Sequence, residues 1–156
     1  MWLGISPMPS SQKARQAVIG LIEKTGDGPV FDLGSGWGNL IIPLARKYPE
    51  RKIVGYELSL IPWSVSLILK HTLKLNNLQL YRKNFLKADL SDASVCVCYL
   101  YPKGMQRLAE KISAGEMAPQ FLISNNFALP DHQPAETLQL TDFYRSPVYL
   151  YRFVHP

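Results

Sequence analysis

Hydrophobic residues along this chain form two kinds of pattern that alternate from beginning to end. Short continuous runs predict buried strands, whereas apolar positions that recur every three or four residues predict amphipathic helices. The predicted strands cover residues 29–33, 52–56, 78–81, 94–100 and 120–124. The predicted helices cover residues 12–24, 39–48, 59–74 and 105–112. Strands that alternate with helices are typical of an α/β fold, in which helices cover both faces of a mostly parallel sheet.

The last part of the chain departs from this alternation. Two further apolar runs, 137–140 and 148–154, follow each other with no helical pattern between them. Two consecutive strands without a crossover helix pair antiparallel. We therefore expect a hairpin at one edge of the sheet.

The predicted helix after Ser59 has an unusually apolar sequence. Its apolar residues recur at helical spacing and are expected to form the stripe that faces the core: Ile61, Val65, Ile68, Leu69 and Leu73. Pro62 lies in the first turn, where its missing N–H costs no hydrogen bond. Lys70, His71 and Lys74 lie near the end, where positive charge suits the helix dipole.

Length and composition narrow the class of protein. The chain has 156 residues, of which 47% are hydrophobic and 19% charged, with a formal charge of +5. These values predict one globular domain over residues 1–156 and exclude intrinsic disorder. Neither a secretory signal nor an apolar stretch of about 20 residues is visible. Cys96 and Cys98 are too close in sequence for an unstrained mutual disulfide, so we expect a reduced, cytoplasmic setting.

One segment carries recognisable chemistry. The strand at 29–33 includes Asp32 and runs into Gly34, Gly36 and Gly38 before a helix, and Glu57 ends the next strand. Parallel strands present such residues together, because these sheets bind ligands at the carboxyl ends of their strands. A dinucleotide site needs G-x-G-x-x-G, whereas the third glycine position counted from Gly34 is occupied by asparagine.

The Asp-x-Gly-x-Gly-x-Gly segment with the acidic residue after the next strand resembles class I S-adenosylmethionine-dependent methyltransferases. Residues 7–10, 32–38 and 54–58 more narrowly resemble the small protein-lysine methyltransferases that modify mitochondrial membrane proteins, and their bacterial relatives. The similarity extends over residues 7–153. It implies a Rossmann-like seven-stranded sheet, S-adenosylmethionine as cofactor and a protein lysine as substrate.

The same resemblance implies roles for individual residues. Glu57 would accept hydrogen bonds from both ribose hydroxyls, Asn84 would meet the adenine edge, and residues 1–11 would form a lid over the cofactor. The complete set of implied cofactor contacts is Asp32, Gly34, Ser35, Gly36, Gly38, Glu57, Leu58, Asn84, Phe85 and Leu100. Tyr101 and Pro102 would lie beside the point of methyl transfer. Asn84 has an equally good interpretation as a turn or capping residue.

Other functional classes remain open at this stage. An RNA methyltransferase would use the same cofactor site, although no stripe of Lys and Arg interleaved with aromatic residues is present. A small-molecule methyltransferase and a non-catalytic cofactor-binding protein are two further alternatives. His71, His132 and His155 lack the spacing of metal ligands, so no metal is expected.

Overall fold

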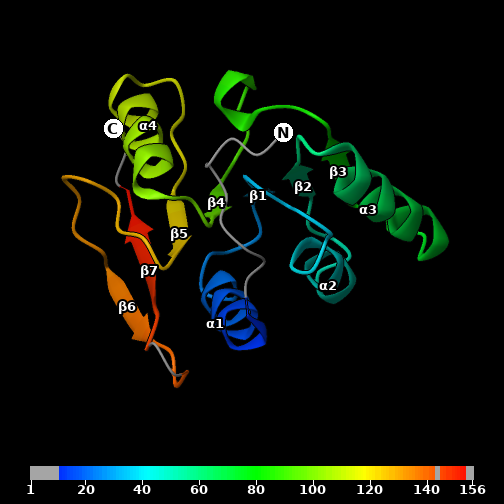
Figure 1. Cartoon of the computed structure of the whole chain (residues 1–156), viewed down its shortest axis with the longest axis horizontal. Helices are drawn as coiled ribbons and strands as arrows, with labels where there is room; N and C mark the ends of the chain where they lie inside the picture. The colour runs from blue at the N-terminus through cyan, green and yellow to red at the C-terminus, as the bar shows by residue number, and fades with distance from the viewer. Residues whose placement is uncertain (1–10, 143–144, 154–156) are drawn as a thin grey trace.

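Seven strands form a single mixed sheet in the computed structural model, which describes residues 11–142 and 145–153. In chain order the strands are β1 (Val30–Asp32), β2 (Ile53–Tyr56), β3 (Leu78–Tyr81), β4 (Val95–Cys98), β5 (Phe121–Asn125), β6 (Glu136–Gln139) and β7 (Pro147–Arg152). They lie side by side in the order β3-β2-β1-β4-β5-β7-β6 (Figure 1). Strands β1 to β5 are parallel, and β7 is antiparallel to both β5 and β6. The predicted fold and its C-terminal hairpin are confirmed.

Helices cover both faces of this sheet because each central strand is apolar on both sides. The helices are α1 (Gln12–Ile22), α2 (Ile41–Lys47), α3 (Leu60–Thr72) and α4 (Pro102–Ser113), with a short 3-10 turn η1 (Phe85–Lys87). Val30 packs in one core with α1 and α2, whereas the next residue, Phe31, packs in a second core with α4 and η1. Helix α3 lies next to β3, at one end of the sheet (Figure 1).

Several boundaries differ from those predicted. Helix α4 begins at Pro102, three residues before the predicted start, because proline fits the first position of a helix without losing a hydrogen bond. Helix α2 begins at Ile41 instead of residue 39, since the glycine loop extends further than expected. Strand β4 ends at Cys98, which places residues 99 and 100 beyond the sheet instead of inside it.

The predicted apolar stripe of α3 is wrong as a core-facing surface. Ile61 and Ile68, which belong to that stripe, are 66% and 65% exposed, and Ser66 is the helix's one buried residue. The reason lies in what the helix packs against. The Ser66 hydroxyl donates to the carbonyl oxygen of Gly36 at 3.3 Å, so α3 turns a small residue toward the glycine loop. Ser59 is the N-cap of α3, although its side chain makes no capping bond.

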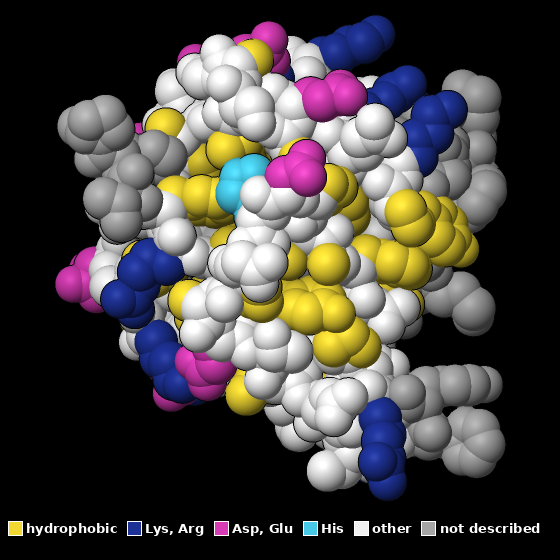
Figure 2. Space-filling model, turned by 90° about the vertical axis from the view of Figure 1, so that its left-hand side faces the viewer, with side chains coloured by type: hydrophobic (Ala, Val, Ile, Leu, Met, Phe, Trp, Pro, Cys, Tyr) yellow, Lys and Arg dark blue, Asp and Glu magenta, His cyan; other side chains and the backbone are white. Residues whose placement is uncertain are grey.

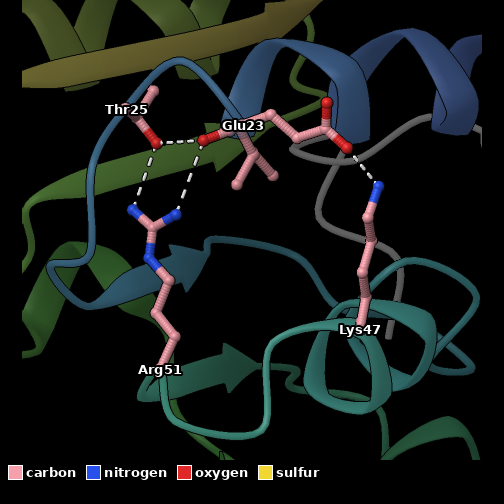
Figure 3. A network of polar contacts seen from close by, with 5 residues as sticks. Glu23, Thr25, Lys47 and Arg51 are labelled. Carbon is pink, nitrogen blue, oxygen red and sulfur yellow. Dashed lines mark hydrogen bonds and ion pairs between the residues drawn. The ribbon is translucent and has the colours of Figure 1, made fainter.

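A polar network lies at the amino ends of the parallel strands, where these strands begin (Figure 3). The guanidinium of Arg51 is buried just before β2 and donates to Thr25 Oγ1 at 3.1 Å and to the carbonyl oxygens of Gly28 and Ile22. Burial lowers the pKa of Arg51 from its usual range, against the opposing effect of the nearby Asp27 carboxylate. A separate ion pair joins Lys47 of α2 to Glu23. These contacts fix the ends of α1 and α2 to the sheet.

The predicted lid, residues 1–11, falls almost wholly outside the described residues. Its last residue, Ser11, is the N-cap of α1, and its hydroxyl oxygen accepts from the backbone N–H of Ala14 at 3.1 Å. This bond fixes where α1 begins.

Candidate active site

The loop after β1 turns sharply at two glycines. Gly36 and Gly38 have φ angles of +55° and +86°, a region that residues with a side chain rarely adopt. A Cβ atom at Gly38 would lie 2.9 Å from Ile42 Cγ1 and 3.1 Å from Ser66 Oγ, so the loop passes closely between α2 and α3. At Gly36, by contrast, an added Cβ would meet nothing within 4 Å. The loop therefore leaves open space beside Gly36.

Glu57 faces this loop from the end of β2. One carboxylate oxygen accepts from the backbone N–H of Gly36 at 2.8 Å, and the other accepts from the backbone N–H of Ser59 at 2.9 Å. The two bonds hold the carboxylate in a fixed orientation between the loop and the start of α3. Each oxygen has a second acceptor position, so the group still offers two acceptors to a ligand.

Asp32 lies deeper, at the end of β1. Its side chain is buried, and its Oδ1 atom accepts from the backbone N–H of Gly34 at 3.2 Å. Burial raises the pKa of Asp32 to about 7, against the opposing effect of the Gly34 bond and with a smaller contribution from the nearby charge of Glu57. A cationic ligand group at this edge would favour the ionised form.

Gly55 and Ser35 lock the loop to the neighbouring strand. Gly55 is the register partner of Asp32 in β2. A Cβ atom at Gly55 would lie 3.0 Å from Ser35 Cβ, so glycine is needed for this close approach. The backbone N–H of Ser35 donates to the carbonyl oxygen of Tyr56 at 2.9 Å. No local sequence pattern marks Gly55, because its role depends on a contact between segments that are distant in the sequence.

The remaining predicted cofactor contacts differ in how much of each residue is accessible. Asn84 caps η1, with its Oδ1 atom accepting from the backbone N–H of Leu86 at 3.0 Å, as the capping interpretation predicted. Phe85 and Leu100 have side chains buried in the core, so any contact with a ligand has to use their backbone. Leu58 is partly exposed beside Glu57.

Three aromatic side chains gather beyond β4 and β5. The ring of Phe127 stacks on Tyr99, with centroids 6.3 Å apart, and meets the edge of Tyr101 at 5.8 Å. Tyr101 is the N-cap of α4 and Pro102 its first residue. Burial raises the pKa of Tyr99. Neither residue was predicted as part of the site, because Tyr99 lies inside the predicted strand 94–100 and Phe127 lies three residues after the predicted strand 120–124.

These aromatic residues and the glycine loop lie at the same edge of the sheet. Strand β1 is flanked by β2 and β4, and Leu33, which follows β1, donates to the carbonyl oxygen of Val97. The carboxyl ends of β1, β2, β4 and β5 therefore line one continuous edge. That edge combines two oriented acceptors on Glu57, open space at Gly36 and a wall of aromatic side chains. Together these groups fit a ligand in which a nucleoside is joined to a charged amino acid.

The described residues contain neither a metal site nor a membrane-spanning helix. Among residues 11–142 and 145–153, no group of three His, Cys, Asp or Glu side chains is arranged to hold a metal ion. Within the same ranges, no helix has the length and apolar character to span a bilayer. Cys96 and Cys98 are free thiols buried in β4.

Known proteins with similar sequences are lysine methyltransferases. A protein-lysine N-methyltransferase of Saccharolobus islandicus is 25% identical over 147 residues, which is 92% of this chain and 91% of that protein. The mouse adenine nucleotide translocase lysine N-methyltransferase is 32% identical over 110 residues. That match covers 69% of this chain and 47% of the mouse protein, so the chain spans about half the length of this relative.

The fold has close counterparts among solved structures. An RNA methyltransferase of Salinibacter ruber, crystallised with S-adenosyl-L-homocysteine, superposes with a TM-score of 0.82 and 22% identity over 96% of this chain and 95% of its own. Residues 32–136 match the ANTKMT methyltransferase domain, a segment that contains Asp32, the glycine loop, Glu57 and the aromatic residues. This chain belongs to the ANTKMT methyltransferase domain family and is an S-adenosylmethionine-dependent methyltransferase.

Proposed function

We propose that this enzyme methylates the ε-amino group of a lysine in a protein substrate. The observation that carries the proposal is the aromatic group of Tyr99, Tyr101 and Phe127 at the edge that holds the glycine loop. A flat aromatic wall suits the long methylene chain of lysine and attracts its cationic head. The names of the Saccharolobus and mouse relatives give independent support for lysine.

S-adenosylmethionine supplies an electrophilic methyl group on a positively charged sulfur. The protein's own part is to position the two reactants and to remove water from between them. The Glu57 carboxylate and the open backbone at Gly36 hold and orient the cofactor. The rings of Tyr99 and Phe127 exclude water from the path of the lysine, which favours its neutral, nucleophilic amine by desolvation. No dedicated pair of acid and base residues is needed for this chemistry.

We also infer that the enzyme works in the cytoplasm. Support comes from Cys96 and Cys98, which are free thiols. Burial raises the pKa of both thiols, Cys98 to about 12, so neither is a reactive thiolate at neutral pH. Stable, unpaired thiols of this kind are typical of a reducing compartment.

Incubation with tritiated S-adenosylmethionine and a lysate of the source cells tests the substrate class. We expect the label in protease-sensitive, ribonuclease-resistant material, and acid hydrolysis should release it as methyl-lysine. Phe127→Ala should lower kcat/KM by roughly tenfold or more while leaving the cofactor Kd within about twofold, because it removes the wall but no cofactor acceptor. Phe121→Ala is the control, because Phe121 begins β5 and so lies at the opposite end of the strand that precedes Phe127.

RNA is the second candidate, and the whole-chain similarity to the Salinibacter ruber enzyme favours it. Label that disappears on ribonuclease treatment and survives protease would overturn the lysine proposal. It would leave the cofactor assignment intact, because binding of S-adenosyl-L-homocysteine is measured separately by calorimetry.

A further inference from the structure

Charged side chains are distributed unevenly between the two ends of the parallel strands. The ion pairs of the described residues lie where helices end and strands begin: Lys24 with Glu136, Lys47 with Glu23, Lys52 with Asp92 and Lys111 with Glu116. Many cations at the amino ends therefore have an acidic partner. On the face in Figure 2, which shows the β6 side of the molecule, Asp and Glu side chains likewise stand among the Lys and Arg side chains.

The connections at the carboxyl ends, where the cofactor site lies, carry a different balance of charge. Four exposed cations, which we call the cationic rim, occur there: Arg82 and Lys83 after β3, Lys87 in η1, and Lys103 at the start of α4. None of the four forms an ion pair with another described residue. Asp32 is buried, and both oxygens of Glu57 accept from backbone N–H groups, so neither carboxylate pairs with the rim.

The acidic residues that follow the rim in the chain turn toward the amino ends. Asp92 pairs at 2.9 Å with Lys52, which directly precedes β2. Asp89 accepts from the backbone N–H of Ser91 at 2.9 Å. Its hydrogen bonds to Ser91 and, to a smaller degree, the charge of Lys111 in the last turn of α4 lower its pKa. The rim therefore keeps its positive charge.

The rim lies beside the groups that form the candidate site. The Nε atom of Arg82 donates to the carbonyl oxygen of Leu58 at 3.1 Å, directly after Glu57. The ammonium of Lys83 lies 5.4 Å from the centre of the Tyr81 ring at the end of β3. Lys103 is the second residue of α4, whose first turn contains no acidic residue, so the positive end of the helix dipole adds to its charge.

We propose that the cationic rim selects protein substrates in which acidic residues accompany the target lysine on one side. This inference rests on the proposed lysine specificity. A lysine side chain is itself a cation, so the rim repels it as it approaches the site. Carboxylates beside the target lysine reverse this repulsion, whereas basic neighbours increase it.

The rim covers only part of the edge, which determines where the acidic residues have to be. Strands β3 and β4 are three strand spacings apart, or ~14 Å, and an extended peptide covers this distance in about four residues. The connection between β5 and β6 contains Asp131 and no Lys or Arg. A peptide whose lysine reaches the aromatic group therefore meets cations within about four residues on the side of β3, and none on the side of β5.

An RNA strand fits this charge distribution less well. Its phosphates would also be attracted to the rim, but a strand that passed the aromatic group would continue along the edge to Asp131. Binding grooves for single strands keep positive charge along the whole track of the backbone. RNA is nevertheless an outcome that the experiment below detects.

Synthetic peptides with one central lysine test the proposal on the intact enzyme. In one set the residues before the lysine are all aspartate, all asparagine or all arginine, and in a second set the same residues follow the lysine. In one of the two sets, kcat/KM should be about tenfold or more higher for the aspartate peptide than for the asparagine peptide, and lowest for the arginine peptide. The differences should shrink with added salt, because the charges are exposed.

Charge variants give a matched comparison. Lys83→Gln/Lys87→Gln should raise KM for the aspartate peptide by about fivefold or more and leave kcat within about twofold, because charges away from the methyl group act equally on the bound substrate and the transition state. Lys70→Gln/Lys74→Gln removes the same charge at the same spacing near the end of α3 and should change neither value by more than about twofold. Circular dichroism and S-adenosyl-L-homocysteine binding confirm that both variants are folded.

The outcomes separate this inference from the lysine proposal. Equal kcat/KM for all peptides, or an unchanged preference for aspartate in Lys83→Gln/Lys87→Gln, would overturn the role of the rim and leave lysine methylation intact. Methyl-lysine in none of the peptides would overturn the inference as well. If the label from the lysate were also sensitive to ribonuclease, the lysine proposal would fail with it, and the rim would be assigned to RNA phosphates.

Discussion

Glu57 is the side chain that orients the glycine loop, and we propose that it also recognises the cofactor. Its two oxygens already accept from the N–H groups of Gly36 and Ser59. A carboxylate held by two backbone donors is oriented before the cofactor arrives, so little side-chain entropy is lost on binding. The proposed contact with the ribose hydroxyls follows from the acceptor positions that remain.

Glu57→Gln should weaken cofactor binding while leaving the protein folded. The amide removes the charge and one acceptor, and hydrogen bonds to charged groups contribute roughly 1.5–3 kcal/mol, equivalent to about ten- to hundredfold in Kd. Titration calorimetry with S-adenosyl-L-homocysteine gives the value. Glu50→Gln, which removes the same charge from an exposed turn, should bind as the unaltered protein does. An unchanged Kd for Glu57→Gln would show that the carboxylate does not contact the ligand.

Asp32 should make folding stability depend on pH. Its pKa is raised by burial from 3.8 in the unfolded chain to about 7 in the folded protein. The folded state therefore holds the proton more tightly, and this stabilisation is complete below about pH 4 and is lost as pH rises through 7. Asp32→Asn keeps an acceptor for Gly34 but cannot ionise, so its free energy of unfolding should fall less between pH 4 and 7.

Urea unfolding of both proteins at several pH values in this range measures that difference. Parallel pH profiles for the two proteins would contradict the assignment. The same titration predicts that a cationic cofactor group near Asp32 releases a proton on binding near pH 7. Calorimetry in buffers with different ionisation enthalpies detects such a release.

Helix α3 shows how an element can be predicted correctly in position and wrongly in orientation. Its periodic apolar residues identify the helix, but they do not identify what covers it. Ser66, a polar residue in the middle of that pattern, is the residue that touches the protein. It occupies the small space that Gly38 leaves beside the loop.

Ser66→Leu should separate α3 from the glycine loop. Overpacking in a tight contact costs about 1–3 kcal/mol, whereas Ser66→Ala loses only one long hydrogen bond and should cost about 1 kcal/mol or less. The leucine variant should also bind the cofactor more weakly, because Gly36 would shift relative to Glu57. Chemical unfolding and calorimetry on both variants give the comparison. Equal stability of the two variants would mean that α3 does not pack tightly against the glycine loop at Ser66.

The strands were easier to predict than the site. The central strands are buried on both faces, so their continuous apolar runs mark them clearly in the sequence. The motif formed by Asp32, the glycines and Glu57 lies within two adjacent strand–loop units. It can therefore also be recognised from the sequence. Tyr99 and Phe127 come together only because β4 and β5 are neighbours in the sheet, and no local pattern pairs them.

At the scale of the whole molecule, the carboxyl ends and the amino ends of the parallel strands carry different groups of residues. The carboxyl ends of the parallel strands carry the glycine loop, Glu57 and the aromatic group. The amino ends carry the buried guanidinium of Arg51, which donates to Thr25 (Figure 3). The same side chain donates to the carbonyl oxygens of Gly28 and Ile22 and so holds the chain before β2 in place. Stability and ligand binding should therefore be separable by substitution.

Arg51→Met should lower the melting temperature and preserve the response to cofactor. Loss of the guanidinium leaves buried oxygens without donors, which costs roughly 2–3 kcal/mol, or about 5–10 °C in a domain of this size. Saturation with S-adenosyl-L-homocysteine at about one hundred times Kd adds roughly 2.7 kcal/mol to any variant with an intact site. The ligand-induced rise in melting temperature should therefore be the same for Arg51→Met and the unaltered protein.

Glu57→Gln should show the reverse pattern, with a smaller loss of baseline melting temperature than Arg51→Met and a clearly reduced rise with ligand. Differential scanning fluorimetry of the three proteins, with and without ligand, measures both quantities together. If Arg51→Met also lost the ligand-induced rise, the network at the amino ends of the strands would be coupled to the cofactor site through the short strand β1. The geometry argues against such coupling, because the sheet hydrogen bonds of β1 to β2 and β4 fix Asp32 and the glycine loop from both sides, without any contribution from Arg51.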